Sequence, residues 1–229
     1  EGASGADGAY VAYPFAALAA CVALASARSR CLVVGEDLGT VPEGLREQLS
    51  AARVFSYRVL WFEREGHTFV PPARWPVEAA ACVSTHDLPT IAGWWSGADL
   101  AERAALRMLD GQGAAAAQRE RQAAKSALIA AIEAAGLAPL GALSPTASCD
   151  DAMVAAIHRF VGASSSALSL LQADDLAGET AALNLPATDR ERPNWRRRIA
   201  IDVDALWQTR IGAQAALDLA ATRGVEPHS

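Results

Sequence analysis

The sequence predicts an α/β protein built around a parallel sheet, and three observations support this. Short runs rich in Val, Ala and aromatic residues, at 31–34, 54–62 and 80–84, are typical of strands. Helical patterns cover residues 15–27, before the first run, and 42–52, between the first and the second. Polar loops with carboxylates directly follow the first and third runs. Alternation of this kind is typical of βαβ units, whose strands are parallel.

The first strand carries the first candidate site. Cys31–Val34 is a short apolar run, as expected of a strand buried on both faces, and Glu36 and Asp37 follow it. Thr40 and Glu43 have the spacing of a capping box, which predicts that a helix begins there. Ligands collect at the carboxyl ends of parallel strands, so Glu36 is a candidate site residue. The alternative is that the two acidic residues only cap the next helix.

The third strand leads into a second candidate site. His86 and Asp87 follow the run at 80–84, and Trp94 and Trp95 come soon after. We expect Asp87 to lie at the same edge of the sheet as Glu36. Indole faces pack on sugar rings and carboxylates bind their hydroxyls, so the set suits a carbohydrate, with Trp94 as the candidate indole. The alternatives are that Asp87 caps a helix and that the tryptophans belong to the core.

The rest of the chain divides by pattern into a helical region and a final section. Helical spacing dominates 99–162, where the last helix is predicted to start at Asp150 or Asp151. A strand at 166–171, a polar segment at 172–192 and an amphipathic helix at about 203–223 follow. We therefore divide the chain into a barrel part at 1–98, a helical insertion at 99–162, and a last strand, cleft loop and helix at 163–229.

Composition restricts the class of ligand. The 229 residues are 52% hydrophobic, enough for a real core, and the formal charge is −6 with no long run of either sign. This excludes nucleic acid and anionic membranes as expected partners and favours a neutral ligand.

Cysteine usage and the absence of targeting signals predict a cytoplasmic protein. The four cysteines, Cys21, Cys31, Cys82 and Cys149, lie far apart with no C-x-x-C pair, which predicts buried thiols rather than disulfides or zinc ligands. We recognise no signal peptide and no apolar stretch long enough for a bilayer.

Several motifs together resemble the C-terminal part of the 4-alpha-glucanotransferases, also called amylomaltases or disproportionating enzymes. The resemblance covers the chain from end to end and rests on four ordered motifs: Val34–Pro42, Ser56–Phe62, Ser84–Thr90, and Asn184–Pro186 with Pro193–Arg197. It implies strands five to eight of a TIM-type (β/α)8 barrel with a helical insertion. The implied partner is an α-1,4-glucan or maltooligosaccharide, and no metal or organic cofactor is implied.

The resemblance also implies a mechanism and assigns residues to it. Family members transfer glucan segments with retention, by double displacement through a covalent glycosyl-enzyme. Glu36 matches the acid/base. Asp87, with His86, matches the pair that binds ring hydroxyls and stabilises the oxocarbenium-like transition state. Asn184, with Asp174 and Asp175 upstream of it, matches a polar segment near the cleft, and Asp37 is a further candidate for binding.

One departure from the family pattern changes the expected activity. The family nucleophile lies in an Arg-x-Asp motif before the acid/base strand, and no such motif precedes Glu36 here. We therefore predict that this chain alone is inactive, and that exposed half-barrel edges favour self-association. The alternatives are a fragment of an α-glucan hydrolase or branching enzyme, and a non-catalytic sugar-binding fragment.

Overall fold

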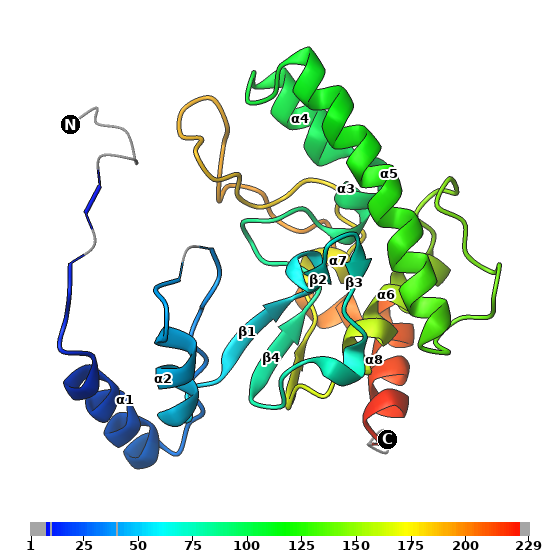
Figure 1. The fold of residues 1–229 in the computed structure, drawn as a ribbon. Coiled ribbons are helices and arrows are strands. Elements are labelled where there is room, and N and C mark those ends of the chain that lie inside the picture. The colour runs from blue at the N-terminus through cyan, green and yellow to red at the C-terminus, as the bar shows by residue number, and fades with distance from the viewer. Residues whose placement is uncertain (1–7, 10, 40, 225–229) are drawn as a thin grey trace. The chain divides into compact units, whose positions relative to one another are not determined.

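A computed structural model describes residues 8–9, 11–39 and 41–224 of the chain. The residues form two compact units, 1–56 and 57–229. The second unit holds most of the helices and the hydrophobic core (Figure 1).

The first unit contains two helices. Helix α1 spans Phe15–Ser29 and α2 spans Leu45–Ala51, which confirms the helices predicted at 15–27 and 42–52. Gly44, with φ of 79°, precedes α2 as its N-cap residue. The predicted capping box depends on Thr40, which lies outside the described residues.

The strand predicted at 31–34 is reduced to a single bridge, so this prediction is wrong. Val34 pairs with Phe55 in a parallel bridge, supported by Gly35 N–H donating to the Phe55 carbonyl at 2.8 Å. Leu32 is 62% exposed and Val34 is 40% exposed. Neither α1 nor α2 buries a residue, so this stretch does not have the helix-covered faces expected of a strand buried on both sides.

A three-stranded sheet, in the order β1-β4-β5, forms the centre of the second unit. Strand β1 spans Ser56–Val59, β4 spans Ala79–Cys82 and β5 spans Leu168–Leu170. Strands β4 and β5 are parallel, with Ala80 opposite Leu168, and every residue of β4 is buried. The α/β class and the parallel pairing are therefore confirmed, with shorter strands than the runs suggested.

The run predicted as a strand at 54–62 is a strand only over Ser56–Val59, and its last three residues form a 3-10 turn, so this part of the prediction is wrong. After β1 the chain makes a 3-10 turn at Leu60–Phe62 (η2) and then an antiparallel hairpin of β2, Arg64–Glu65, and β3, Thr68–Phe69. A second 3-10 turn, η3, spans Pro72–Arg74.

The region predicted to be helical contains α4, Ala98–Ala105, α5, Gly111–Ala134, and α6, Asp151–Gly162. The Asp150 carboxylate accepts the Met153 N–H at 2.9 Å, which confirms the predicted start of α6. The shorter α3 spans Ile91–Ser96. Helices α3 to α6 belong to the same compact unit as β4 and β5, and the division of the chain into three parts stays a prediction.

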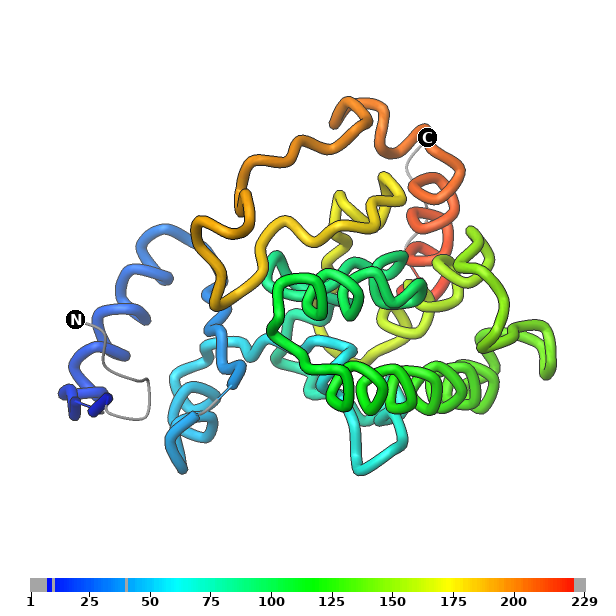
Figure 2. The backbone as a smooth tube through the Cα atoms, turned by 90° about the horizontal axis from the view of Figure 1, so that it is seen from above, coloured from blue at the N-terminus to red at the C-terminus, as the bar shows by residue number. Residues whose placement is uncertain are grey.

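The C-terminal section contains α7, Ala173–Leu176, a 3-10 helix at Val203–Gln208 (η4) and α8, Arg210–Arg223. The single helix predicted at 203–223 is broken at Thr209, whose extended backbone lets its hydroxyl accept the Gly212 N–H at 2.9 Å. Between α7 and η4 the chain runs outward and returns, in yellow and orange in Figure 2. This segment carries Asn184 and Trp195.

The core of the second unit lies around α6, which contacts both β4 of the sheet and α5. Trp95, Phe160, Leu128 and Ile157 are among its largest fully buried side chains. Helix α8 packs along α6, so α6 is covered on its outer side as well (Figure 1).

The exposure of the four thiols differs between the two units. Cys82 in β4 is buried, as predicted, and burial raises its pKa to about 11. Cys149 is partly buried, and burial raises its pKa to about 12. Cys21 and Cys31 are exposed, against the prediction, and α1, which carries Cys21, buries none of its residues. All four thiols are free.

Candidate functional site

The loop after β4 presents His86 and Asp87 at the surface of the second unit. Ser84 is buried, and its hydroxyl donates to the Pro89 carbonyl at 2.7 Å, which closes the loop beneath the two side chains. The side chain of His86 is 52% exposed and that of Asp87 is 43% exposed. Thr90, and not Asp87, caps α3 by accepting the Gly93 N–H at 3.0 Å. Asp87 therefore has no capping role and faces solvent.

Asn184 meets this pair from a segment far along the chain. Its side-chain amide donates to Asp87 Oδ1 at 2.6 Å, and its backbone N–H donates to the His86 carbonyl at 3.1 Å. His86 Nε2 lies 3.4 Å from the same Asp87 oxygen. The structure thus brings together three of the residues proposed from the sequence, and both side-chain contacts converge on Oδ1.

Trp195 completes the cluster and was not among the candidate residues. Its ring lies 5.0 Å from the His86 ring, tilted by 46°, and it is 58% exposed. Its backbone has a φ of 61°, which is strained for a bulky residue, and its N–H donates to the Leu183 carbonyl at 3.2 Å. An indole in a polar segment just after Pro193 was the available signal, because aromatic residues exposed on loops often bind ligands.

Trp94 does not occupy the sugar-contacting position predicted for it. It is 6% exposed. Trp61 stacks on its ring at 4.4 Å and 10°, and the Arg121 guanidinium lies 4.6 Å from the ring centre. With its indole covered in this way, Trp94 is a packing residue, which was the alternative left open by the sequence.

The two acidic candidate residues of the first unit, Glu36 and Asp37, differ in exposure and in hydrogen bonding. Asp37 is 3% exposed, and its carboxylate accepts the Arg46 Nε–H at 2.8 Å while Arg46 Nη2 donates to its carbonyl. It fastens the loop to α2 and does not face solvent, in contrast to the binding role predicted for it. Glu36 is exposed, and its acid/base role stays a prediction.

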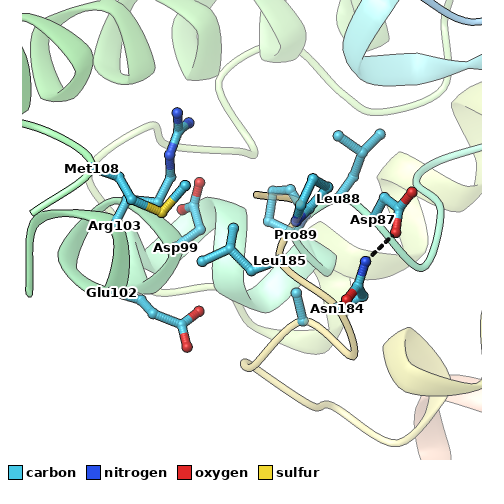
Figure 3. Close-up of a pocket in the computed structure, with 11 residues that line it drawn as sticks. Asp87, Leu88, Pro89, Asp99, Glu102, Arg103, Met108, Asn184 and Leu185 are labelled. Atoms are coloured by element: carbon cyan, nitrogen blue, oxygen red, sulfur yellow. Dashed lines mark hydrogen bonds between the residues drawn. The ribbon is translucent and has the colours of Figure 1, made fainter. Parts of the chain in front are cut away.

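A pocket of about 220 Å³ adjoins the cluster. Figure 3 shows Asp87 and Asn184 facing each other at one end of it, with Asp99, Glu102 and Arg103 at the other. Apolar side chains also line the pocket: Leu88, Pro89, Met108, Leu185 and Pro186. A second, polar pocket of about 310 Å³ is lined by Asn184 and Trp195 among others. Asn184 therefore lines both pockets.

The described residues contain neither a candidate metal site nor a candidate membrane span. In that part of the chain no group of three or more His, Cys, Asp or Glu side chains is placed to hold a metal ion. None of the described helices combines the length with the apolar composition that a bilayer span requires.

Comparisons with known proteins show which family this chain resembles. The sequence model of the family described as 4-alpha-glucanotransferase matches residues 2–203. A 4-alpha-glucanotransferase of Haemophilus influenzae is 35% identical over 204 residues, which cover 87% of this chain and 29% of the relative. One of Mycobacterium bovis is 34% identical over 201 residues, covering 86% of this chain and 27% of the relative. The chain thus spans less than a third of the length of these relatives.

The fold is also similar to that of a solved structure. The chain resembles the crystal structure of an amylomaltase from Corynebacterium glutamicum with a TM-score of 0.82 and 26% identity. The match covers 92% of this chain and 32% of that one. The α/β architecture with its parallel sheet accordingly corresponds to part of a TIM-type barrel. With the family model covering most of its length, this chain belongs to the 4-alpha-glucanotransferase family.

Proposed function

We propose that this chain carries part of the glucan site of a 4-alpha-glucanotransferase that transfers α-1,4-glucan segments with retention. The observation that supports this best is the exposed cluster of His86, Asp87, Asn184 and Trp195, formed by two segments whose paired residues lie 97 apart (Asp87 and Asn184) and 109 apart (His86 and Trp195). Solvent-facing carboxylate, imidazole and amide groups beside an exposed indole form the combination that binds a sugar ring.

Each member of the cluster has a role in this proposal. Asp87 accepts hydrogen bonds from ring hydroxyls, and its negative charge stabilises the positive charge that develops on the sugar in the transition state. Asn184 holds Asp87 Oδ1 at 2.6 Å, which orients the carboxylate before the sugar arrives. Trp195 offers an apolar face to the sugar ring beside His86.

Glu36 supplies the acid/base step in the same proposal. It protonates the oxygen of the leaving sugar and then takes the proton of the acceptor hydroxyl that attacks the glycosyl-enzyme. The attacking carboxylate of a retaining enzyme must lie about 5 Å from the acid/base. No Arg-x-Asp motif precedes Glu36 in these 229 residues, so we propose that the chain alone binds glucan without turning it over.

Titration calorimetry with maltotriose, combined with product analysis, tests binding and turnover together. We expect saturable binding by the wild-type chain, with neither glucose nor longer oligomers released. Asp87→Ala should weaken binding at least about tenfold, because a charged hydrogen-bonding partner of the sugar is lost. Asp204→Ala, which removes an exposed carboxylate on η4, is the matched control and should bind as wild type does.

Three results would contradict the proposal. Glucose appearing with longer oligomers would refute the predicted inactivity. Equal affinities of wild type and Asp87→Ala would remove Asp87 from the site. Absence of maltotriose binding would refute the glucan site itself.

We further propose that the chain self-associates through apolar surface of its first unit. Helix α1 buries none of its residues, and Leu18 and Leu24 are about half exposed, at 50% and 51%. Such surface recruits a second apolar surface in water. Light scattering across micromolar concentrations should show a mass that rises above that of the monomer, and Leu18→Glu should lower it. A wild-type chain that stays monomeric over this range would contradict the proposal.

A further inference from the structure

Arg192 lies at the centre of the segment that carries Asn184 and Trp195. It is only 8% exposed although it is charged. Its Nη2 donates to the Ala182 carbonyl at 2.6 Å, and its Nη1 donates to the Leu183 carbonyl at 3.3 Å and to Asn194 Oδ1 at 2.6 Å. One side chain thus joins the outgoing limb of the segment, at 182–183, to the returning limb at 194.

Asn194 extends this join to the other side of Asn184. Its Oδ1 also accepts the Leu185 N–H at 3.1 Å, and its Nδ2 donates to the Thr188 carbonyl at 3.1 Å and hydroxyl at 2.8 Å. Residues 183 and 185, the two neighbours of Asn184, are therefore both held by Arg192 or by its partner Asn194. The Leu183 carbonyl also accepts the Trp195 N–H at 3.2 Å, which ties the strained backbone of Trp195 to the same point.

A carboxylate from α4 orients the guanidinium. Arg192 Nε donates to Glu102 Oε1 at 2.9 Å, and Nη2 lies 3.4 Å from Oε2. All three nitrogens of the planar guanidinium are used, on carbonyl, amide and carboxylate oxygens. A lysine ammonium is a single point charge and cannot bridge these acceptors in the same geometry.

We infer that Arg192 is a positioning residue of the glucan site. By fixing residues 182, 183 and 194 against α4, it sets Asn184 on Asp87 and Trp195 beside His86. The expected effect on sugar binding rests on the proposed function. The positioning of Asn184 and Trp195 by Arg192 does not, because it is a property of the chain without sugar. Arg192 is not required to touch the sugar for this effect.

Arg192→Lys in the full chain tests the inference by two measurements. The first is the 1H–15N spectrum without sugar, in which the Asn184 side-chain amide and the Trp195 indole signals are assigned from their loss in Asn184→Asp and Trp195→Phe. Both signals should shift in Arg192→Lys. The second is maltotriose affinity, which should fall about tenfold, the loss expected for one charge-assisted network.

A matched substitution separates local positioning from a general effect on the fold. Arg74→Lys breaks another double Arg–Glu contact, that of Arg74 with Glu65 on the exposed hairpin side of the unit. It should leave both signals and the affinity as in wild type. Should Arg192→Lys fail to fold, Glu102→Gln takes its place, since it keeps Arg192 and removes only the charge that orients it; the same two signals should then shift by less.

The outcomes are distinct. Unchanged Asn184 and Trp195 signals in a folded Arg192→Lys or Glu102→Gln chain would overturn the inference. Shifted signals with unchanged maltotriose affinity would overturn its link to sugar binding. A wild-type chain that binds no maltotriose would refute the proposed function, while the spectra without sugar still decide whether Arg192 positions the two side chains.

Discussion

Gly93→Ala should lower the free energy of unfolding of the second unit by about 3 kcal/mol or more. Gly93 is buried in α3, and a Cβ atom built there lies 2.3 Å from the Thr180 carbonyl oxygen and 3.0 Å from Thr90 Oγ1. The first contact is with backbone, so no rotamer change relieves it. Thr90 also donates to the Glu179 carbonyl at 2.6 Å, so the segment at 179–180 sits directly on the start of α3.

The same change should weaken maltotriose binding, because residues 179–180 lead to Asn184. Thermal or urea unfolding measures the stability, and calorimetry at a temperature where the variant is folded measures the affinity. Gly111→Ala is the control: no atom lies within 4 Å of its added Cβ, at the first residue of α5. The free energy of unfolding of Gly111→Ala should equal that of wild type or exceed it by up to about 1 kcal/mol. A Gly93→Ala chain as stable as wild type would show that the close approach of 180 is not maintained in solution.

Asp175→Asn should stabilise the protein at high pH and have little effect in acid. Asp175 is 3% exposed, its Oδ1 accepts the Ile91 N–H at 2.7 Å, and its Oδ2 is buried without a hydrogen-bond partner. Burial raises the pKa of this carboxyl from 3.8 to about 7, against the lowering effect of the Ile91 bond, and the nearby Asp174 charge raises it further. The folded chain therefore holds a proton that the unfolded chain releases.

The sign of the pH dependence follows from this. The stability from a raised carboxyl pKa is fully present below pH 3.8 and is lost as the pH rises through 7. Asparagine keeps the acceptor for Ile91 and carries no charge at any pH. The free energy of unfolding of Asp175→Asn minus that of wild type should rise between pH 4 and pH 7 by up to about 4 kcal/mol.

The difference between the two proteins isolates this one group. Burial lowers the pKa of His158 to about 4, so the stability of both proteins falls as the pH drops from 6.5, but His158 is common to both and its effect cancels. Urea unfolding at several pH values measures the two curves. A difference that does not change with pH would show that the Asp175 carboxyl is not buried as the structure has it.

Local features of the sequence were sufficient for the longer helices, apart from the break at Thr209 in the helix predicted at 203–223. The start of α6 was predicted from Asp150, whose carboxylate accepts the N–H group three residues later. The order of elements, with short apolar runs between helices, predicted the α/β class and the parallel sheet. The ordered motifs around Glu36, His86 and Asn184 were sufficient for the family. These features share one physical cause: each depends on residues that are neighbours in the chain.

Whether an individual side chain is buried or exposed was decided only by the tertiary structure. Trp94 and Trp195 are the same residue type, but one is covered by Trp61 and Arg121 and the other is left exposed beside His86. Asp37 is buried because Arg46 reaches it from α2, while Asp87 faces solvent because Thr90 takes the capping role. Burial and pairing depend on which distant segments meet. A single sequence records the residue types of those segments but not the contacts that packing creates between them.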